Sequence, residues 1–264
     1  MTIEGLIAAQ RYQEALRLAQ EEVKKHPGDH RLLNLCADLF VFLREEAAAE
    51  RVLLHVADLH ASEGASGKAV VALKKVQGLG RGDEAMYDSL ASRIRHESPT
   101  QETDISEILS SVAFEIEGEP RAIVEESVAD DAVTSPLFDQ FSRDELLAFI
   151  KGLQLLVFDT GDIIVAEGDP GDSLYLLTSG VAKAYVRNRE QRFRRVGTLR
   201  EGDFFGEISI LSGGLRTATI TAASRCELLE IDRPTLDAIT AAHPHVADVM
   251  RRFHDERVSR DGRL

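Results

Sequence analysis

The sequence lacks several features that mark whole classes of protein. Its 264 residues include only two cysteines, Cys36 and Cys226, which fall in different predicted domains, so we expect no disulfide framework. Its most apolar run, residues 32–43, is interrupted by polar residues and is too short to span a bilayer. The first ten residues carry Glu4 and no basic stretch, unlike a signal peptide. These absences predict a cytoplasmic protein with no membrane partner.

Basic residues are also scarce relative to acidic ones. The formal net charge is −14, from 31 Lys and Arg against 45 Asp and Glu. Nucleic-acid binding depends on clustered Lys and Arg that contact phosphates, so this balance predicts no nucleic-acid partner. Most of the acidic surplus lies in residues 97–135, where eleven acids stand against Arg121 alone. Few large apolar residues accompany them, and we expect an acidic, disordered linker over 97–134.

One short segment of this linker has a helical pattern. Ile105, Ile108, Leu109 and Val112 fall at positions i, i+3, i+4 and i+7, and Asp104 is placed to cap them. Such an amphipathic helix is marginal alone and needs a surface to bury against. Docking within the protein, recognition by a partner and absence of stable structure all remain open.

A second charged cluster follows Gly180, in a predicted β-hairpin. Its seven basic residues are Lys183, Arg187, Arg189, Arg192, Arg194, Arg195 and Arg200. They could receive the acidic linker in a salt-sensitive contact, or they could form an ordinary solvated hairpin tip. Few aromatic residues lie among them, which disfavours a nucleic-acid surface.

Residues 1–96 show helical periodicity and no convincing strand. Apolar positions recur at helical spacing in residues 11–26, 32–43, 47–60, 68–76 and 83–94, and Pro27-Gly28 is a strong stop signal. Ala15 and Ala49 are 34 positions apart, so the stretch 8–27 resembles the second half of a tetratricopeptide repeat. Ala69 follows Ala49 by only 20 positions, which breaks the register.

We therefore expect a degenerate tetratricopeptide-like array of about six helices, with an unrelated helical bundle as the alternative. Stacked helical hairpins leave a concave face that suits an unidentified protein or peptide partner. The histidines here do not predict a metal site: His55 and His60 are five positions apart, about 140° around a helix.

The C-terminal half, residues 135–264, has the pattern of short strands followed by helices. Strands are expected over 154–158, 163–165, 173–177, 182–186, 194–199, 218–222 and 226–231, with Gly-Asp turns between several of them. Helices are expected from a Ser142–Glu145 capping box, and over 234–241 and 244–257. This pattern predicts an antiparallel jelly-roll barrel with flanking helices, and hence an α+β fold of two domains.

The most informative segment is residues 202–219, which we call the cassette. Gly206 would begin a helix of one or two turns, whose free N–H groups and dipole attract an anion. Arg216 returns on the next strand and could fork onto a phosphate. Glu207 would repel a phosphate unless a sugar hydroxyl donates to it. These residue types therefore predict a compact ligand with one phosphate and one ribose hydroxyl.

The pattern Phe-Gly-Glu, eight residues, then Arg-Thr-Ala-Thr closely resembles the phosphate-binding cassette of the cyclic nucleotide-binding domain family. The resemblance runs from about residue 135 to 256 and includes turn glycines at Gly161, Gly168, Gly171 and Gly180. It implies that Arg216 holds the cyclic phosphate of cAMP or cGMP and that Glu207 holds the ribose 2′-hydroxyl.

The resemblance implies roles for further residues. The family's backbone contacts would come from Gly206, Ile208, Ser209 and Ala218, and Thr217 is compatible with either base. In the family a C-terminal helix moves against the barrel, which makes Val249, Met250 and Phe253 candidates for a lid; ordinary core packing is the alternative. Leu215 departs from the family, since binders often carry Pro there, and this loosens the turn before Arg216 without removing a contact.

Together these features predict a signalling or adaptor protein that senses a cyclic nucleotide and relays it through the helices or linker to a protein partner. A ligand-independent scaffold with a vestigial domain is the alternative. No nucleophile elbow, zinc-ligand motif or Walker loop is found, so we expect no enzyme and no metal. The chain ends at Leu264 without room for a DNA-binding helix-turn-helix, so we expect no transcription factor. Homo-oligomerisation is left open.

Overall fold

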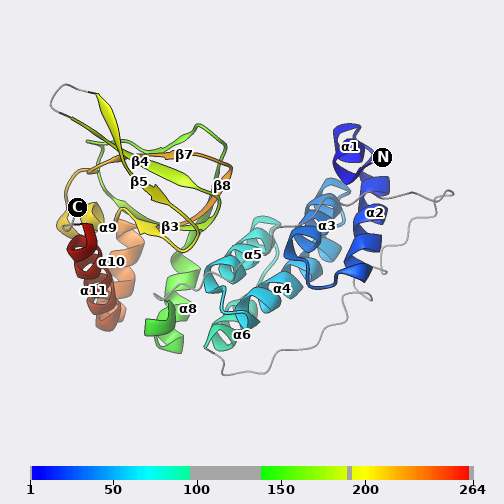
Figure 1. The fold of residues 1–264 in the computed structure, drawn as a ribbon. Helices are drawn as coiled ribbons and strands as arrows, with labels where there is room; N and C mark the ends of the chain where they lie inside the picture. Colours follow the sequence, from blue (N-terminus) through cyan, green and yellow to red (C-terminus); the bar gives the residue numbers. More distant parts are fainter. Residues whose placement is uncertain (1, 96–137, 189–191, 262–264) are drawn as a thin grey trace.

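The computed structural model describes residues 2–95, 138–188 and 192–261 (Figure 1). The first range is entirely helical, as expected. Its helices are α1 (Ile3–Ala8), α2 (Tyr12–Lys25), α3 (His30–Phe42), α4 (Glu46–Ser62), α5 (Ser66–Gly78) and α6 (Glu84–Ile94). The expected linker over 97–134 lies outside the described residues, and so do its amphipathic segment and the tip of the basic hairpin.

One helix-ending turn recurs along this helical region. Gln10, Arg44 and Gly64 each have positive φ, and the residue after each donates its N–H to a carbonyl five positions earlier. Ala15, Ala49 and Ala69 lie five positions after these turns and are fully buried. The first turn joins α1 to α2 and the second joins α3 to α4, so two helices lie between them, which gives the spacing of 34. The third turn joins α4 to α5, so only one helix lies between it and the second, which gives the spacing of 20. That the helices are tetratricopeptide repeats stays a prediction.

The C-terminal region is built from two four-stranded antiparallel sheets. One has the order β1-β8-β3-β6 and the other β2-β7-β4-β5. The strands are β1 (Gln154–Phe158), β2 (Ile163–Val165), β3 (Ser173–Ser179), β4 (Ala182–Arg187), β5 (Phe193–Leu199), β6 (Phe204–Phe205), β7 (Thr219–Ala222) and β8 (Cys226–Asp232). The expected strands are present, and the described strands form two antiparallel sheets typical of a jelly roll, as expected. That these sheets close into a barrel stays a prediction.

Helices flank these sheets. They are η1 (Phe138–Gln140), α8 (Arg143–Gly152), α9 (Glu207–Ser212), α10 (Arg233–Ala242) and α11 (Pro244–Asp261). The capping box at the start of α8 is confirmed: the Ser142 hydroxyl accepts from the Glu145 N–H, and the Glu145 carboxylate accepts from the Ser142 N–H. Both cysteines are free and buried, which confirms the expectation of no disulfide. No helix in the described ranges is long and apolar enough to cross a membrane.

Strand β3 separates two apolar cores because its side chains alternate between two faces. Tyr175 and Leu177 face a core enclosed between the two sheets, whereas Leu174 and Leu176 join a larger core that includes α8 and the helical region. The outer face of the β1-β8-β3-β6 sheet is thus covered by helices from both parts of the chain (Figure 1).

The helical region meets this sheet through α5. A Cβ on Gly67 would lie 3.2 Å from Leu176 Cδ2 and 3.3 Å from Thr178 Cγ2, so the helix packs very closely on β3. Ion pairs surround the contact. Lys68 pairs with Glu201 at 3.0 Å and Lys75 pairs with Glu227 at 2.8 Å. Further pairs join α6 to α8, namely Arg143 with Asp88 and Lys151 with Glu84.

Candidate functional site

The cassette begins with a turn that requires glycine for two reasons. Gly206 caps the N-terminus of α9 with φ +88, a left-handed conformation that residues with a Cβ rarely adopt. A Cβ there would also lie 2.6 Å from Arg216 Nη1 and 2.7 Å from the Ser173 main-chain oxygen. The guanidinium and the start of α9 are therefore in close contact.

Arg216 is the buried cation of the cassette, with only 6% of its surface exposed. Its Nη1 donates to the main-chain oxygen of Ser173 at 2.7 Å, and its Nη2 donates to the Ser173 hydroxyl at 3.1 Å. The guanidinium carbon lies 5.5 Å from the centroid of the Tyr175 ring, within range of a cation–π interaction. The side chain is thus anchored on the first residues of β3.

Ser173 and Tyr175 complete this anchor, and sequence reasoning had missed both. They lie on the same face of β3, and the Ser173 hydroxyl donates to the Tyr175 oxygen at 2.9 Å. Tyr175 stacks on Phe205 with ring centroids 5.0 Å apart. Burial raises the pKa of the Tyr175 phenol, so the hydroxyl stays neutral at physiological pH. An alternation of polar and apolar residues along β3 was the only available signal.

The other expected site residues divide by exposure. Glu207 and Ser209 are buried, whereas Ile208 and Thr217 are exposed and Ala218 is half-buried. The cassette therefore contains a buried carboxylate, that of Glu207, and a buried guanidinium, that of Arg216. Such an arrangement offers one cation, one anion and a helix N-terminus, which suits binding of an anion that also carries hydroxyl groups.

The return segment of the cassette is held by the loop before β3. The Arg216 N–H donates to the Asp169 carbonyl at 2.8 Å, and the Gly168 N–H donates to the Arg216 carbonyl at 2.9 Å. A Cβ on Gly171 would lie 1.9 Å from Ser209 Cβ, so this glycine is needed for close packing against α9. Leu215, where the family often has Pro, is 62% exposed.

Arg233 is another residue of the site that sequence reasoning missed. Its Nη2 donates to the carbonyls of Gly171 and Ser209, at 3.4 and 3.3 Å, and its Nε lies 3.3 Å from an Asp172 carboxylate oxygen. It fastens the start of α10 to both α9 and the loop before β3.

Comparison with known proteins agrees with this geometry. The family model described as the cyclic nucleotide-binding domain matches residues 155–243. Those residues form a cyclic nucleotide-binding domain.

Relatives of this domain occur in regulators. A CRP-like cAMP-activated global transcriptional regulator of Mycobacterium tuberculosis is 31% identical over 124 residues, which cover 47% of this chain and 55% of that protein. A cAMP-dependent protein kinase regulatory subunit of Schizosaccharomyces pombe is 29% identical over 150 residues, covering 57% of this chain and 34% of that protein. The chain thus spans about half, or less, of the length of these relatives.

Among solved structures, the catabolite activator protein of Thermus thermophilus is similar. It is 31% identical with a TM-score of 0.44, and the match covers 48% of this chain and 59% of that one.

The expected lid of the cyclic nucleotide-binding domain lies on α11, which contacts α9. Val249 is fully buried and Met250 is 3% exposed. The side chain of Phe253 lies outside what the structure describes. That these residues cap a bound base stays a prediction, and their burial is what core packing also requires.

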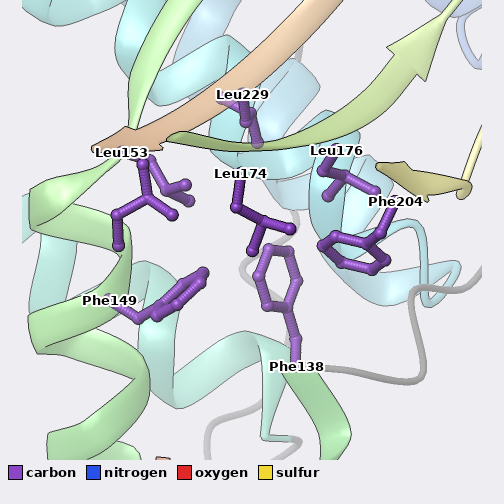
Figure 2. A pocket seen from close by; sticks show the side chains of 8 residues that line it. Phe138, Phe149, Leu153, Leu174, Leu176, Phe204 and Leu229 are labelled. Atoms are coloured by element: carbon purple, nitrogen blue, oxygen red, sulfur yellow. The ribbon is translucent and has the colours of Figure 1, made fainter. Parts of the chain in front are cut away.

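An apolar gap is lined in part by Leu174 and Leu176 of β3 (Figure 2), which face away from the core that contains Tyr175. The space between its lining side chains is too small to hold a water molecule. The lining residues come from η1, α8 and the outer face of the sheet: Phe138, Phe149, Leu153, Leu174, Leu176, Phe204, Leu229 and Ile231. Because the gap is small and apolar, it does not suit a nucleotide.

Proposed function

We propose that the cyclic nucleotide-binding domain of this chain binds cAMP or cGMP in its cassette. Arg216 would bind the cyclic phosphate, Glu207 the ribose 2′-hydroxyl, and the main-chain N–H groups of Gly206, Ile208 and Ser209 would surround the phosphate. The observation that carries the proposal is the contact of the buried Arg216 guanidinium with Gly206 at the start of α9. The cAMP-activated regulator among the relatives makes cAMP the first ligand to test.

The donors of Arg216 are sufficient for this role. A guanidinium has five N–H donors, and the bonds to Ser173 use two of them. Three donors are left for a phosphate, which a guanidinium binds well in a forked geometry. The bonds to Ser173 and the contact with Tyr175 hold the guanidinium in place, which would preorganise it for a ligand.

We further propose that ligand binding is relayed to a protein partner through the helical region. Two contacts support this relay. Helix α5 packs on β3, the strand that anchors Arg216, and Lys68 of α5 pairs with Glu201, five positions before Gly206. A ligand that moves either element would therefore act on α5. Such a change requires unequal affinity for two states, about 5.5 kcal/mol to move a 1:99 ratio to 99:1.

Calorimetry with cAMP and cGMP tests the binding proposal. We expect 1:1 binding to the wild type and a loss of about 30-fold or more in Arg216→Leu, since truncating one partner of a buried charge pair costs about 2–5 kcal/mol. Because Arg216 is buried, folding of the variant is checked by circular dichroism, and Glu207→Gln provides a second, nearly isosteric test. The exposed Arg225 gives a matched control, Arg225→Leu, which we expect to bind normally.

A ligand-independent scaffold is the second candidate, because Arg216 already bonds to the protein's own Ser173. In that case the guanidinium has a purely structural role. No heat of binding with either nucleotide, in a well-folded wild type, would favour the scaffold over the sensor.

A further inference from the structure

A cluster of two histidines and a glutamate lies in the helical region, away from the cyclic nucleotide site. His30 is the first residue of α3, His60 lies in the last turn of α4, and Glu63 is the C-cap residue of α4. Each offers one ligand atom, and these three atoms all lie within 4.8 Å of one another. The cluster joins two neighbouring helices at one end.

The separations suit a small divalent cation. Glu63 Oε2 lies 2.8 Å from His30 Nε2 and 3.9 Å from His60 Nδ1. In a tetrahedral zinc site with bonds of about 2.0–2.1 Å, neighbouring ligand atoms are roughly 3.4 Å apart. The two measured separations lie on either side of this value, and all three ligand atoms lie within 4.8 Å of one another, so the side chains would rotate to reach tetrahedral geometry.

The setting also restricts the side chains. The His30 and His60 rings stack with centroids 4.1 Å apart and an interplanar angle of 21°, so they would turn out of this stack for both nitrogen lone pairs to point at one ion. His60 is 6% exposed, whereas the Glu63 side chain is 44% exposed, so the cluster is fixed on one side and open to solvent on the other. An open side allows a metal to enter and leaves room for a water molecule as a fourth ligand.

We propose that His30, His60 and Glu63 form a binding site for a divalent transition metal, with zinc as the best match. Two imidazoles and one carboxylate are a known donor set for zinc with one open coordination position. Imidazole nitrogen atoms also favour zinc, copper, nickel and iron over magnesium or calcium.

The position of the proposed site suggests that a bound metal would stabilise the packing of α3 against α4. It would cross-link the N-terminus of α3 to the C-terminus of α4, directly before the turn that joins α4 to α5. Gly67, four positions after Glu63, packs against Leu176 of β3. A bound metal would therefore stabilise the part of the helical region that contacts the cyclic nucleotide-binding domain.

The test uses full-length protein without a histidine tag, stripped of metal by a chelator and titrated with zinc chloride in a calorimeter. We expect one zinc ion per chain and a rise in melting temperature when zinc is added. We expect Glu63→Gln and His60→Gln to weaken binding at least about tenfold, because even changes behind the direct ligands cost about 10–100-fold. Cobalt substitution adds a spectroscopic readout, the visible absorption of a four-coordinate ion.

Glu63→Gln is the decisive variant, because its exposed side chain can be changed without disturbing the core. His243→Gln, a histidine in the other domain, serves as the matched control and should bind zinc like the wild type. The proposal is overturned by the absence of zinc binding, or by equal zinc affinity in wild type and Glu63→Gln. Neither result depends on cyclic nucleotide binding.

Discussion

Arg216 and Ser173, 43 positions apart in the chain, are joined by two hydrogen bonds that use both terminal nitrogens of the guanidinium. Ser173 begins β3, and the next residue, Leu174, faces the opposite side of the sheet, where α8 and the helical region pack. Ser173, which anchors the Arg216 guanidinium, is therefore next in the chain to Leu174, which packs in the core shared with α8 and the helical region. A movement of Arg216 on ligand binding has a short physical path to these helices.

Replacement of Ser173 by alanine tests the strength of this anchor. The variant removes one acceptor from a buried guanidinium and the donor to Tyr175, and hydrogen bonds to charged groups contribute about 1.5–3 kcal/mol. We expect the free energy of unfolding to fall by about this amount, measured by urea denaturation. Ser212→Ala, which removes an exposed hydroxyl bonded to the Ile208 carbonyl, should change it by less than about 0.5 kcal/mol. If Ser173→Ala changes the free energy of unfolding as little as Ser212→Ala is expected to, the anchor adds no stability.

The Gly206→Ala variant separates backbone strain from steric contact with Arg216. Both Gly206 and Gly213 have positive φ, at +88 and +70, so alanine strains the backbone at either position. Only at Gly206 would the new Cβ meet Arg216 Nη1, because a Cβ on Gly213 has nothing within 4 Å. We expect both variants to lose about 1 kcal/mol or more of stability, and only Gly206→Ala to weaken cyclic nucleotide binding strongly, as measured by calorimetry. A similar loss of affinity in Gly213→Ala would contradict this account.

The packing of α5 on β3 is tested by Gly67→Leu. The added side chain would collide with Leu176 and Thr178, and overpacking of this kind costs about 1–3 kcal/mol. Gly78, at the other end of α5, has open space around it, so Gly78→Leu should be neutral or stabilising by up to about 1 kcal/mol. Urea denaturation compares the two. If the variants behave alike, α5 does not pack on β3 in solution.

Gly67→Leu also addresses the proposed relay. Binding and conformational change are reciprocally linked, so disturbing α5 should alter cyclic nucleotide affinity if the helical region responds to the ligand. Calorimetry on the folded variant gives this answer separately from stability. An unchanged affinity would argue for two domains that are packed together but not coupled.

The sequence predicted the elements of this fold better than their contacts. Helical periodicity, the Ser142 capping box and the cassette pattern are local signals, and the helices and strands that they indicate are present. The broken 34-residue spacing could not be interpreted from sequence, because it depends on a turn that recurs at Gln10, Arg44 and Gly64 in spite of different residue types. The jelly roll was expected from strand spacing and Gly-Asp turns, which do not determine the order of the strands within the two sheets.

The site shows the same division between local and long-range signals. Gly206, Glu207 and Arg216 were recognised from a contiguous pattern. Ser173 could not be, because a serine at the start of a strand has no special mark until Arg216 is seen to bond with it. The histidine cluster was missed for a similar reason: only His55 and His60, on one helix, were compared, whereas His30 comes from a different helix.

Lys74 provides a prediction of pH dependence. Lys74 is 7% exposed, and its ammonium group donates to the Lys151 carbonyl at 3.2 Å and lies 5.2 Å from the Tyr87 ring centroid. Burial lowers the pKa of Lys74 from 10.5 to about 8, so between these values the unfolded chain binds a proton that the folded chain has released. The free energy of unfolding should therefore rise as the pH increases from about 8 towards 10.5, and the burial cost is fully present below pH 8.

The pKa shift of Lys74 sets the size of this rise in the free energy of unfolding, and replacing Lys74 provides the test. The difference in pKa corresponds to about 3 kcal/mol, an upper estimate because the ammonium keeps hydrogen bonds and an aromatic contact. In Lys74→Met the titrating group is absent, so the rise attributable to it should vanish, while Lys24→Met, on the exposed face of α2, should keep the wild-type slope. Urea denaturation at several pH values between 7 and 10.5, expressed as the difference between wild type and each variant, cancels the contribution of other groups. The same slope in Lys74→Met and in the wild type would show that Lys74 keeps its ordinary pKa in the folded protein, and that α5 does not bury it against α8.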